Sequence, residues 1–235
     1  MSKIIAIMLL LCCGMMLFGC ADDNGRRKAE QQKTIVVTDS VGRKVELPYP
    51  LERVAVCNVY NAELITAVGA IDKIVGVDNY IFKDQSGFKN RFNEAQVFGI
   101  SQNAMNYEKL AELAPQAVII TGEGTWRDAQ EMLDRFGIKV IVVNSYYTDQ
   151  FADNCRLVGR IFGREEQAEE LVRYFTDKLA YIQSQLKDVP RKSLYFEYRT
   201  LGKTAVPGDY FYKMVEYSGA DNIFAAAEGL SLIHI

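Results

Sequence analysis

The chain has 235 residues, of which 49% are hydrophobic and 24% charged, and its formal net charge is −3. This length predicts one or two globular domains with enough residues to bury a core. Because the net charge is slightly negative and no basic stripe occurs along the chain, nucleic acid is not an expected partner.

The N-terminal segment is organised as an export signal. Lys3 precedes an apolar run from Ile4 to Phe18, which is short for a membrane-spanning helix and ends just before Cys20. The tetrapeptide Leu-Phe-Gly-Cys that ends at Cys20 resembles the bacterial lipobox, in which the cysteine is lipidated. We therefore expect residues 1–20 to be a lipoprotein signal peptide. An uncleaved N-terminal anchor is the alternative, and both would hold the exported protein on the cell membrane, facing the periplasm or the cell exterior.

The cysteine and histidine content limits the cofactors. In the body of the chain only Cys57 and Cys155 remain, and these could form a disulfide after export or stay as two buried thiols. The single histidine is His234, and no Cys-x-x-Cys pair occurs. A zinc or iron–sulfur site built by the protein is therefore not expected, and neither is a resident cofactor.

Predicted strands and helices alternate over residues 34–148. After a polar, aperiodic and flexible tether at residues 21–33, a hairpin is expected at Thr34–Leu47, with its turn at Asp39–Arg43. Short apolar runs then alternate with amphipathic segments: strands are expected at 54–56, 74–77, 96–98, 118–120 and 140–143, and helices at 61–68, 107–114 and 127–136. This alternation predicts right-handed βαβ crossovers and a parallel sheet, so residues 34–148 should form an N-terminal α/β lobe.

The longest periodic segment runs from Arg164 to Leu186. Apolar residues recur there at spacings of three and four, acidic residues follow its first position, and Pro190 lies beyond its end. These are the features of a long amphipathic helix, and about 22 residues give a rod about 33 Å long. With a second helix expected at about 149–162, residues 149–189 form a helical linker. An ordinary packing helix explains the periodicity equally well.

The pattern restarts after Pro190. A strand is expected at Ser193–Tyr198 and a helix at Tyr210–Tyr217, with Gly219 just past the helix end. Because few residues follow the long helix, we expect residues 190–235 to be a partial C-terminal α/β lobe. Residues 230–235 lack caps and turn residues, and we expect them not to be the native end.

Several short stretches together resemble one protein family. They are Asp39–Arg43, Pro50–Val54, Glu63–Gly69, Ile74–Val77, Asn106–Leu110, Ala114–Pro115, Gly137–Val140 and Ser218–Phe224. Their order and spacing resemble the substrate-binding proteins of ABC importers for ferric siderophores, haem and cobalamin. The resemblance implies two Rossmann-like α/β lobes with mostly parallel sheets, joined by one long backbone helix, with the ligand in the cleft between them. The second lobe would be incomplete in this chain.

Candidate ligand-binding residues follow the predicted strands. Ligands of open α/β sheets bind beyond the carboxyl ends of the strands, where this sequence has Asn58, Tyr60, Asn61, Asp78, Asn79, Tyr80, Ser101, Gln102, Asn103, Glu123, Thr125, Trp126, Asn144, Ser145, Tyr146, Tyr147, Glu197, Tyr198 and Arg199, with Tyr210 nearby. Tyrosine and tryptophan combine a flat apolar face with a polar group, which suits a large metal chelate. We therefore predict ligand contacts from Tyr60, Tyr80, Trp126, Tyr146, Tyr147, Tyr198, Arg199 and Tyr210.

Two of these predictions have specific reasons. The guanidinium of Arg199 could pair with a carboxylate or another anionic group of the ligand. The resemblance adds support for Tyr80 and Trp126, which match loops that line the pocket in the family. The alternative is that about half of the tyrosines are ordinary core or surface residues.

Glu108 has a different predicted role. On pattern alone it is an exposed glutamate on a helix, and such residues usually face water. The resemblance implies that a glutamate at this place docks on arginines of the membrane permease. Glu63, a second acid on the same face, could be confused with it.

The sequence thus predicts a lipid-anchored substrate-binding protein rather than an enzyme. It would capture a metal chelate and deliver it to an ABC permease and its ATPase. A ferric siderophore is favoured, with haem or cobalamin behind it; a haem reading would use a tyrosine as the axial ligand. The rival is an oxidoreductase or chelatase-like subunit with the same two-lobe fold, which lacks support because no nucleophile–base pair or phosphate loop is present. A fragment unable to fold its second lobe is a third possibility.

Overall fold

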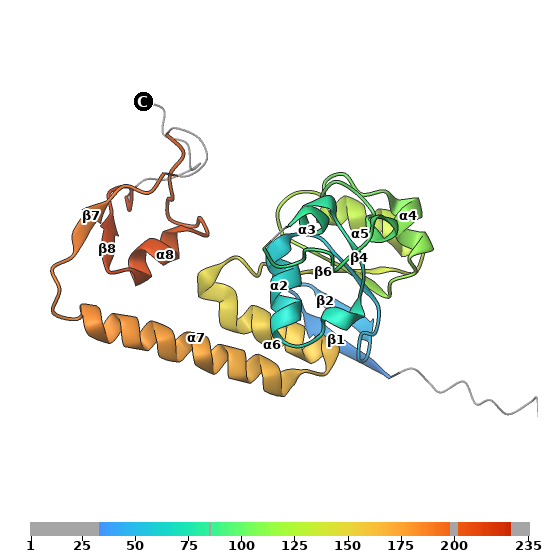
Figure 1. Cartoon of the computed structure of the whole chain (residues 1–235), viewed down its shortest axis with the longest axis horizontal. Helices are drawn as coiled ribbons and strands as arrows, with labels where there is room; N and C mark the ends of the chain where they lie inside the picture. The colour runs from blue at the N-terminus through green and yellow to red at the C-terminus, as the bar shows by residue number, and fades with distance from the viewer. Residues whose placement is uncertain (1–32, 85, 198–201, 227–235) are drawn as a thin grey trace, which may run out of the picture. The chain divides into compact units, whose positions relative to one another are not determined.

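The computed structural model describes residues 33–84, 86–197 and 202–226 (Figure 1). The predicted signal peptide with Cys20, nearly all of the predicted tether, and residues 230–235 lie outside this part of the chain. Among the described residues, no helix is long and apolar enough to cross a membrane.

The first described element is the predicted hairpin. Strands β1 (Thr34–Thr38) and β2 (Lys44–Pro48) pair antiparallel in full register. The side chain of Asp39 closes the turn, because its Oδ1 accepts a hydrogen bond of 2.9 Å from the backbone N–H of Arg43. Asp39 Oδ2 also accepts from the backbone N–H of Val142 at 3.2 Å. The hairpin prediction is confirmed, and its tip is fastened to the sheet that follows.

A four-stranded parallel sheet forms the centre of the fold. Its order is β4 (Ile74–Val77), β3 (Val54–Val56), β5 (Ala117–Ile120) and β6 (Lys139–Val142). Helix α2 (Val59–Ala67) connects β3 to β4, and α5 (Trp126–Asp134) connects β5 to β6. Every residue of β3 and β5 is buried, as expected of strands covered on both faces. The mixed α/β fold with a parallel sheet is therefore the predicted one.

Alternate residues of these strands face two separate cores. Val54, Val56 and Ile119 belong to one cluster, which also contains residues of α2 and of α6 (Phe151–Phe162). Ala55 and Val118 belong to the other, which lies under α5 and α4 (Tyr107–Glu112). Burying each valine or isoleucine side chain completely contributes about 1.5–3 kcal/mol to stability relative to leaving it exposed. The period of two thus places helices on both faces and leaves the strand ends open.

The segment between β4 and β5 differs from the prediction. Instead of a strand at 96–98, the chain makes a single parallel bridge, Val77 with Val97, after the 3₁₀ turn η2 (Glu94–Gln96). Asn93 caps this turn, which takes up Gln96 and leaves the extended residue Val97 to make the bridge. The short elements η1 (Ile71–Lys73) and helix α3 (Asn79–Lys83) were not predicted either.

Helices α6 and α7 (Glu165–Leu186) lie side by side (Figure 1). The 3₁₀ turn η3 (Thr148–Gln150) leads into α6, and Gly163, with φ +63°, ends it in the left-handed conformation. The predicted long helix is confirmed over 22 residues. Val172 is buried, and the ring of Phe175 packs on that of Phe151 with centroids 4.5 Å apart.

After α7 the chain forms a small βαβ unit. Strands β7 (Lys192–Leu194) and β8 (Ala220–Asn222) pair in parallel, and α8 (Tyr212–Tyr217) connects them. Gly219 has φ +77°, the conformation expected just past a helix end. The predicted strand at 193–198 is shorter than expected, and β8 was not predicted. Tyr198 and Arg199 lie outside the described residues.

The two cysteines of the body are free thiols. Both are buried, Cys57 in the cluster under α4 and α5 and Cys155 in the cluster on the opposite face of the sheet. Burial raises the pKa of both thiols, that of Cys155 to about 12. Of the two alternatives left open by the sequence, buried thiols describe the structure.

Candidate ligand-binding cleft

A cavity of about 730 Å³ opens beyond the carboxyl ends of β3, β4 and β5. Its volume lies within the range of about 300–1,000 Å³ that is usual for small-molecule sites. Most of its lining comes from the segments that directly follow these strands and from the loop after the Val97 bridge. The lining residues are Asn58, Val59, Tyr60, Glu63, Asp78, Tyr80, Ser101, Gln102, Asn103, Thr121, Glu123 and Gly124.

Asp78 fixes the floor of this cleft. Its side chain is 2% exposed and accepts hydrogen bonds of 2.9 Å from the backbone N–H groups of Asn58 and Ile81. It thereby caps α3 and joins that helix to the turn after β3, where Asn58 has φ +77°. Burial raises the pKa of Asp78, although the backbone donors oppose the shift. Two sequence candidates, Asn58 and Asp78, therefore shape the cleft through contacts within the protein.

Gln102 ties two rim loops together. Its Oε1 accepts hydrogen bonds from the backbone N–H and the hydroxyl of Thr121, at 3.0 and 2.8 Å, and its Nε2 donates to the carbonyl of Glu123. Gly124 has φ +82°, and a side chain there would stand 2.5 Å from Asn103. The loop at 101–103 is thus locked against the loop that carries Glu123.

A second set of polar candidates supports the loops from below. Asn144 Oδ1 accepts a hydrogen bond of 2.7 Å from the backbone N–H of Gly122. The hydroxyl of Ser145 donates to Asn61 Oδ1 at 2.5 Å, and Asn61 Nδ2 donates to the carbonyl of Cys57 at 3.2 Å. These side chains follow strands as predicted, but they bind the protein's own loops.

Four of the predicted tyrosines form one ring cluster beside the cleft. The ring of Tyr146 lies 6.2 Å from that of Tyr60, 4.9 Å from that of Tyr147 and 5.1 Å from that of Tyr210, centroid to centroid. A fifth, Tyr80, lines the cleft separately. Tyr60 and Tyr80 are 50% and 62% exposed and offer open ring faces.

The hydroxyl of Tyr146 is buried and has no hydrogen-bond partner among the described residues. Burial is the largest cause that raises its pKa, and the nearby carboxylate of Glu123 adds to the shift. The pKa of Tyr147 is raised by burial first, then by Glu123, Asp209 and Asp149. A buried hydroxyl without a partner costs free energy, which makes Tyr146 a candidate for a hydrogen bond to a ligand.

The remaining predicted residues lie elsewhere. Trp126 is not among the residues that line the cleft: its ring lies between the guanidinium groups of Arg43 and Arg127, 4.3 and 4.2 Å from the ring centroid. Glu108 is exposed in the first turn of α4. Tyr198 and Arg199 cannot be placed against the cleft because they fall outside the described part of the chain.

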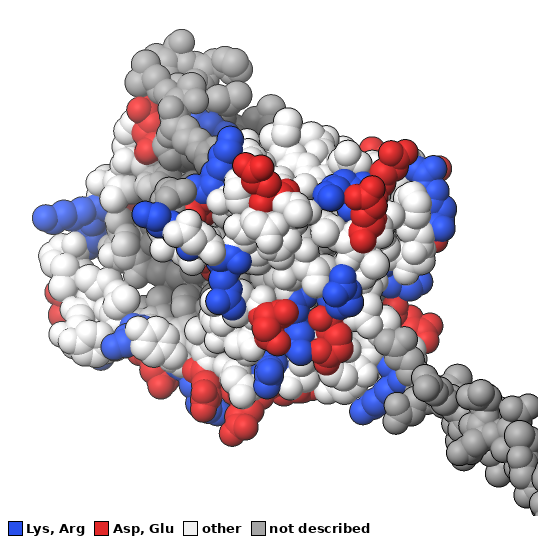
Figure 2. Space-filling model, turned by 45° about the vertical axis from the view of Figure 1, so that its right-hand side comes forward, with Lys and Arg blue, Asp and Glu red and all other residues white. Residues whose placement is uncertain are grey.

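The charged groups that line the cleft are all acidic. They are Glu63, Asp78 and Glu123, and the described lining contains no lysine or arginine. Burial, followed by the charge of Asp84, raises the pKa of Glu63. Elsewhere on the surface both signs are mixed: Figure 2 shows basic and acidic side chains interspersed over one face. The sequence had not placed Glu63 in the ligand site, because it lies one turn into α2 rather than at a strand end.

A second cavity, of about 670 Å³, lies along α7. It is lined mainly by apolar side chains of α7, including Phe175, Leu179 and Ile182, together with Met214 and Tyr217 of α8. It lacks the convergent polar groups that orient a small ligand. The cleft at the strand ends is therefore the candidate site.

A model of the periplasmic binding protein family matches residues 54–232. The chain belongs to this family. Membership agrees with the expectation of a binding protein rather than an enzyme, and with the family resemblance read from the sequence.

The matches with individual relatives span most of this chain but only about three fifths of the length of each curated relative. The molybdate-binding protein MolA of Haemophilus influenzae is 25% identical over 219 residues, which is 81% of this chain and 61% of that protein. The structure of MolA bound to molybdate matches with a TM-score of 0.67 at 22% identity, over 83% of this chain and 67% of that one. The vitamin B12-binding protein of Salmonella typhimurium is 23% identical over 182 residues, which is 75% of this chain and 64% of that protein.

Proposed function

We propose that this protein is the substrate-binding component of an ABC importer and that it captures a metal chelate in the cleft at the strand ends. The observation that carries the proposal is the cavity of about 730 Å³ with the exposed rings of Tyr60 and Tyr80 on its wall. Family membership supports it, as does the similarity to MolA, which is described as the cognate binding protein of an ABC transporter.

The lining favours a chelate over a small oxyanion. Molybdate, the ligand named for MolA, is a compact dianion that requires several cationic or N–H donors around it. The described lining supplies carboxylates, aromatic rings and neutral polar side chains, but no lysine or arginine. Ring faces suit the wide, partly apolar surface of an organic metal complex. We favour a ferric siderophore.

Haem and cobalamin are the alternatives within the same class. Tyr146 and Tyr147 offer phenolic oxygens, which serve as axial ligands of haem iron in some proteins. The vitamin B12-binding protein among the relatives supports the cobalamin alternative. The enzyme alternative has no observation in its favour.

The rest of the chain fits delivery at a membrane. Export and lipid attachment through Cys20 would hold the protein at the cell surface, and residues 34–148, 149–189 and 190–235 would act as N-terminal lobe, helical linker and C-terminal lobe. The side chain of Glu108 is exposed and forms no ion pair or hydrogen bond with another described residue, so its carboxylate is available to dock on a basic surface of the permease. We propose that Glu108→Arg abolishes uptake and leaves ligand affinity unchanged.

Ligand titration of the full chain, purified in mild detergent, tests the binding role. Isothermal calorimetry with ferrichrome, haemin, cyanocobalamin and molybdate is preferable to tryptophan fluorescence, because Trp126 does not line the cleft. One chelate should bind saturably at micromolar concentration or below. Tyr60→Ala combined with Tyr80→Ala should weaken it about tenfold or more, because each ring contact contributes about 0.5–1.5 kcal/mol beyond its buried area.

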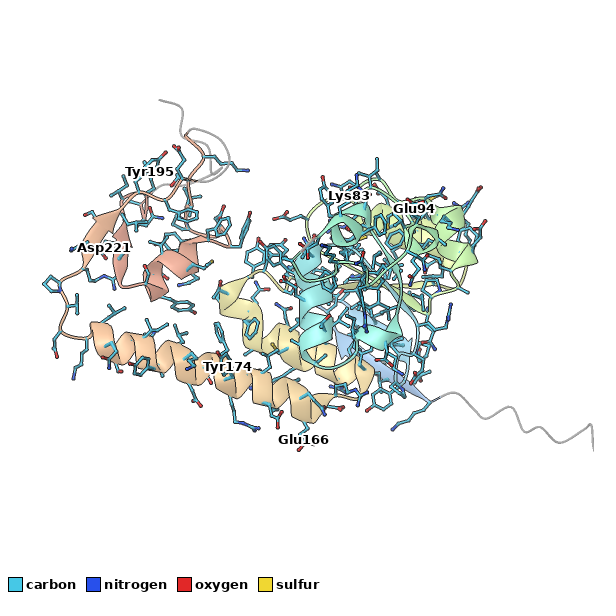
Figure 3. All side chains as sticks on the ribbon, viewed as in Figure 1. Lys83, Glu94, Glu166, Tyr174, Tyr195 and Asp221 are labelled. Atoms are coloured by element: carbon cyan, nitrogen blue, oxygen red, sulfur yellow. The ribbon has the colours of Figure 1, made fainter. Side chains whose placement is uncertain are left out.

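The matched control is Tyr174→Ala. Tyr174 lies on α7 (Figure 3), is 65% exposed and does not line the cleft. It should leave affinity unchanged. If no chelate binds while circular dichroism shows a folded protein, the proposed function is wrong. If the paired tyrosine variant binds as well as the control, the cleft is not the site.

A further inference from the structure

The cleft combines aromatic surface with one sign of charge. Glu63 projects from α2 and Glu123 from the loop after β5, and both line the cavity together with Tyr60 and Tyr80. Both carboxylates are exposed, and no described lysine or arginine forms an ion pair with either. No described cation therefore neutralises the two acids where they face the space that a ligand would occupy.

Neighbouring cations are held by partners outside the cleft. Arg43 forms an ion pair with the buried carboxylate of Asp39 and lies over one face of Trp126, whose other neighbour is Arg127. Lys213 is paired with Glu216 on α8. None of these side chains lines the cavity.

The field beside the cleft is negative as well. Glu123, Asp149 and Asp209 all act on Tyr147 in the direction that disfavours a further negative charge, and Glu123 does so on Tyr146. The buried Tyr146 hydroxyl, which has no partner among the described residues, sits in this field next to the Glu123 loop.

We propose that the cleft selects by charge: it binds metal chelates that are cationic or neutral on the side facing the parallel sheet, with Glu63 and Glu123 as counter-charges, and it rejects anionic chelates and oxyanions. An anionic group brought to this wall meets two carboxylates in a partly desolvated space, where like charges repel more strongly than in water. A pendant ammonium meets the same carboxylates with the opposite sign and gains charge-assisted hydrogen bonds. This inference rests on the proposed function and narrows its ligand class.

A series of ferric chelates that share one metal-binding core and differ at one terminal group, chiefly in its charge, provides the test. Ferrioxamine B carries a pendant ammonium group, its N-acetyl derivative is neutral, and its N-succinyl derivative is anionic, while the ferric trishydroxamate core is the same in all three. Calorimetry on the full chain in detergent should give affinities in the order cationic, neutral, anionic, with about three- to tenfold between steps at low salt. Raising the salt concentration should compress the differences.

Charge removal at the wall should reduce or abolish the preference. Glu123→Gln keeps the shape of the side chain; it should weaken the cationic chelate about three- to tenfold, strengthen the anionic one by a similar factor and leave the neutral one unchanged. Glu63→Gln should act in the same direction. Glu131→Gln is the matched control, since Glu131 is an exposed glutamate of α5 that does not line the cavity.

The outcomes separate the two proposals. If the anionic chelate binds as tightly as the cationic one, or if Glu123→Gln changes all three affinities equally, charge selection is overturned while the importer function stands. If none of the three chelates, nor any ligand in the wider panel, binds saturably, the proposed function fails and the charge rule fails with it.

Discussion

Gly159→Ala tests whether the contact between α6 and α7 is as close as the structure indicates. Gly159 is buried in α6 where that helix meets α7. A Cβ atom built at this position would stand well inside contact distance of the Ala168 methyl group and 2.9 Å from the carbonyl oxygen of Arg164. That carbonyl already accepts a hydrogen bond of 3.0 Å from the backbone N–H of Ala168. Neither neighbour can rotate away, because one is a Cβ and the other is backbone.

Two opposing effects set the magnitude. Replacing glycine by alanine inside a helix normally stabilises the helix by about 1 kcal/mol. Forcing an extra methyl group into a packed interface costs about 1–3 kcal/mol, and more when the backbone must move. Because the clash involves backbone, we place the cost near the upper value and expect the free energy of unfolding to fall by about 2 kcal/mol.

Urea unfolding followed by circular dichroism measures this change. The combination of Gly159→Ala with Ala168→Gly moves the methyl group to the other helix, and it should recover part of the loss. A variant that is stabilised by about 1 kcal/mol, as helix propensity alone would give, would refute the close packing. Full additivity of the two substitutions would refute it as well, since residues in contact should show a coupling energy.

Two further predictions concern the cleft. Asp78→Ala should lower the free energy of unfolding by about 2 kcal/mol or more, because it leaves the N–H groups of Asn58 and Ile81 without an acceptor. Because burial raises the pKa of Asp78 in the folded state, the wild-type protein should lose stability relative to Asp78→Asn as pH rises from the unfolded-state pKa through the raised folded-state pKa, which urea unfolding at several pH values measures. Tyr146→Phe should leave the free energy of unfolding unchanged or raise it by about 1 kcal/mol, because the hydroxyl has no hydrogen-bond partner among the described residues. Urea unfolding measures this change, and chelate affinity, measured by calorimetry, should fall.

The sheet was predictable because its strands are covered on both faces. Val118–Ile120 is a continuous apolar run, and such runs between amphipathic helical segments indicate a parallel sheet. The long helix followed from spacing alone. The strand expected at 96–98 is reduced to a single bridge at Val97, because Asn93 caps a tight turn that takes up Gln96, and this local hydrogen bonding competes with pairing.

The site was only partly predictable, because polar residues at strand ends can either face a ligand or hold the protein's own loops in place. Tyr60 and Tyr80 line the cleft as their positions suggested. Gln102 and Asn144 follow the same pattern, yet their side chains are used to hold Thr121 and Gly122. The place of Trp126 depends on Arg43, whose hairpin docks from a distant part of the sequence. No spacing rule carries that information.

Two features that cost stability lie at the cleft or beside it. Asn58, which lines the cleft, holds a left-handed backbone conformation, and the hydroxyl of Tyr146 has no hydrogen-bond partner among the described residues. Each is the kind of feature that a sequence selected for stability alone would lose, at a gain on the order of 1–3 kcal/mol. Their meeting at the edge of the sheet where the exposed tyrosines and Glu123 lie is an argument for function at this edge that does not depend on the family.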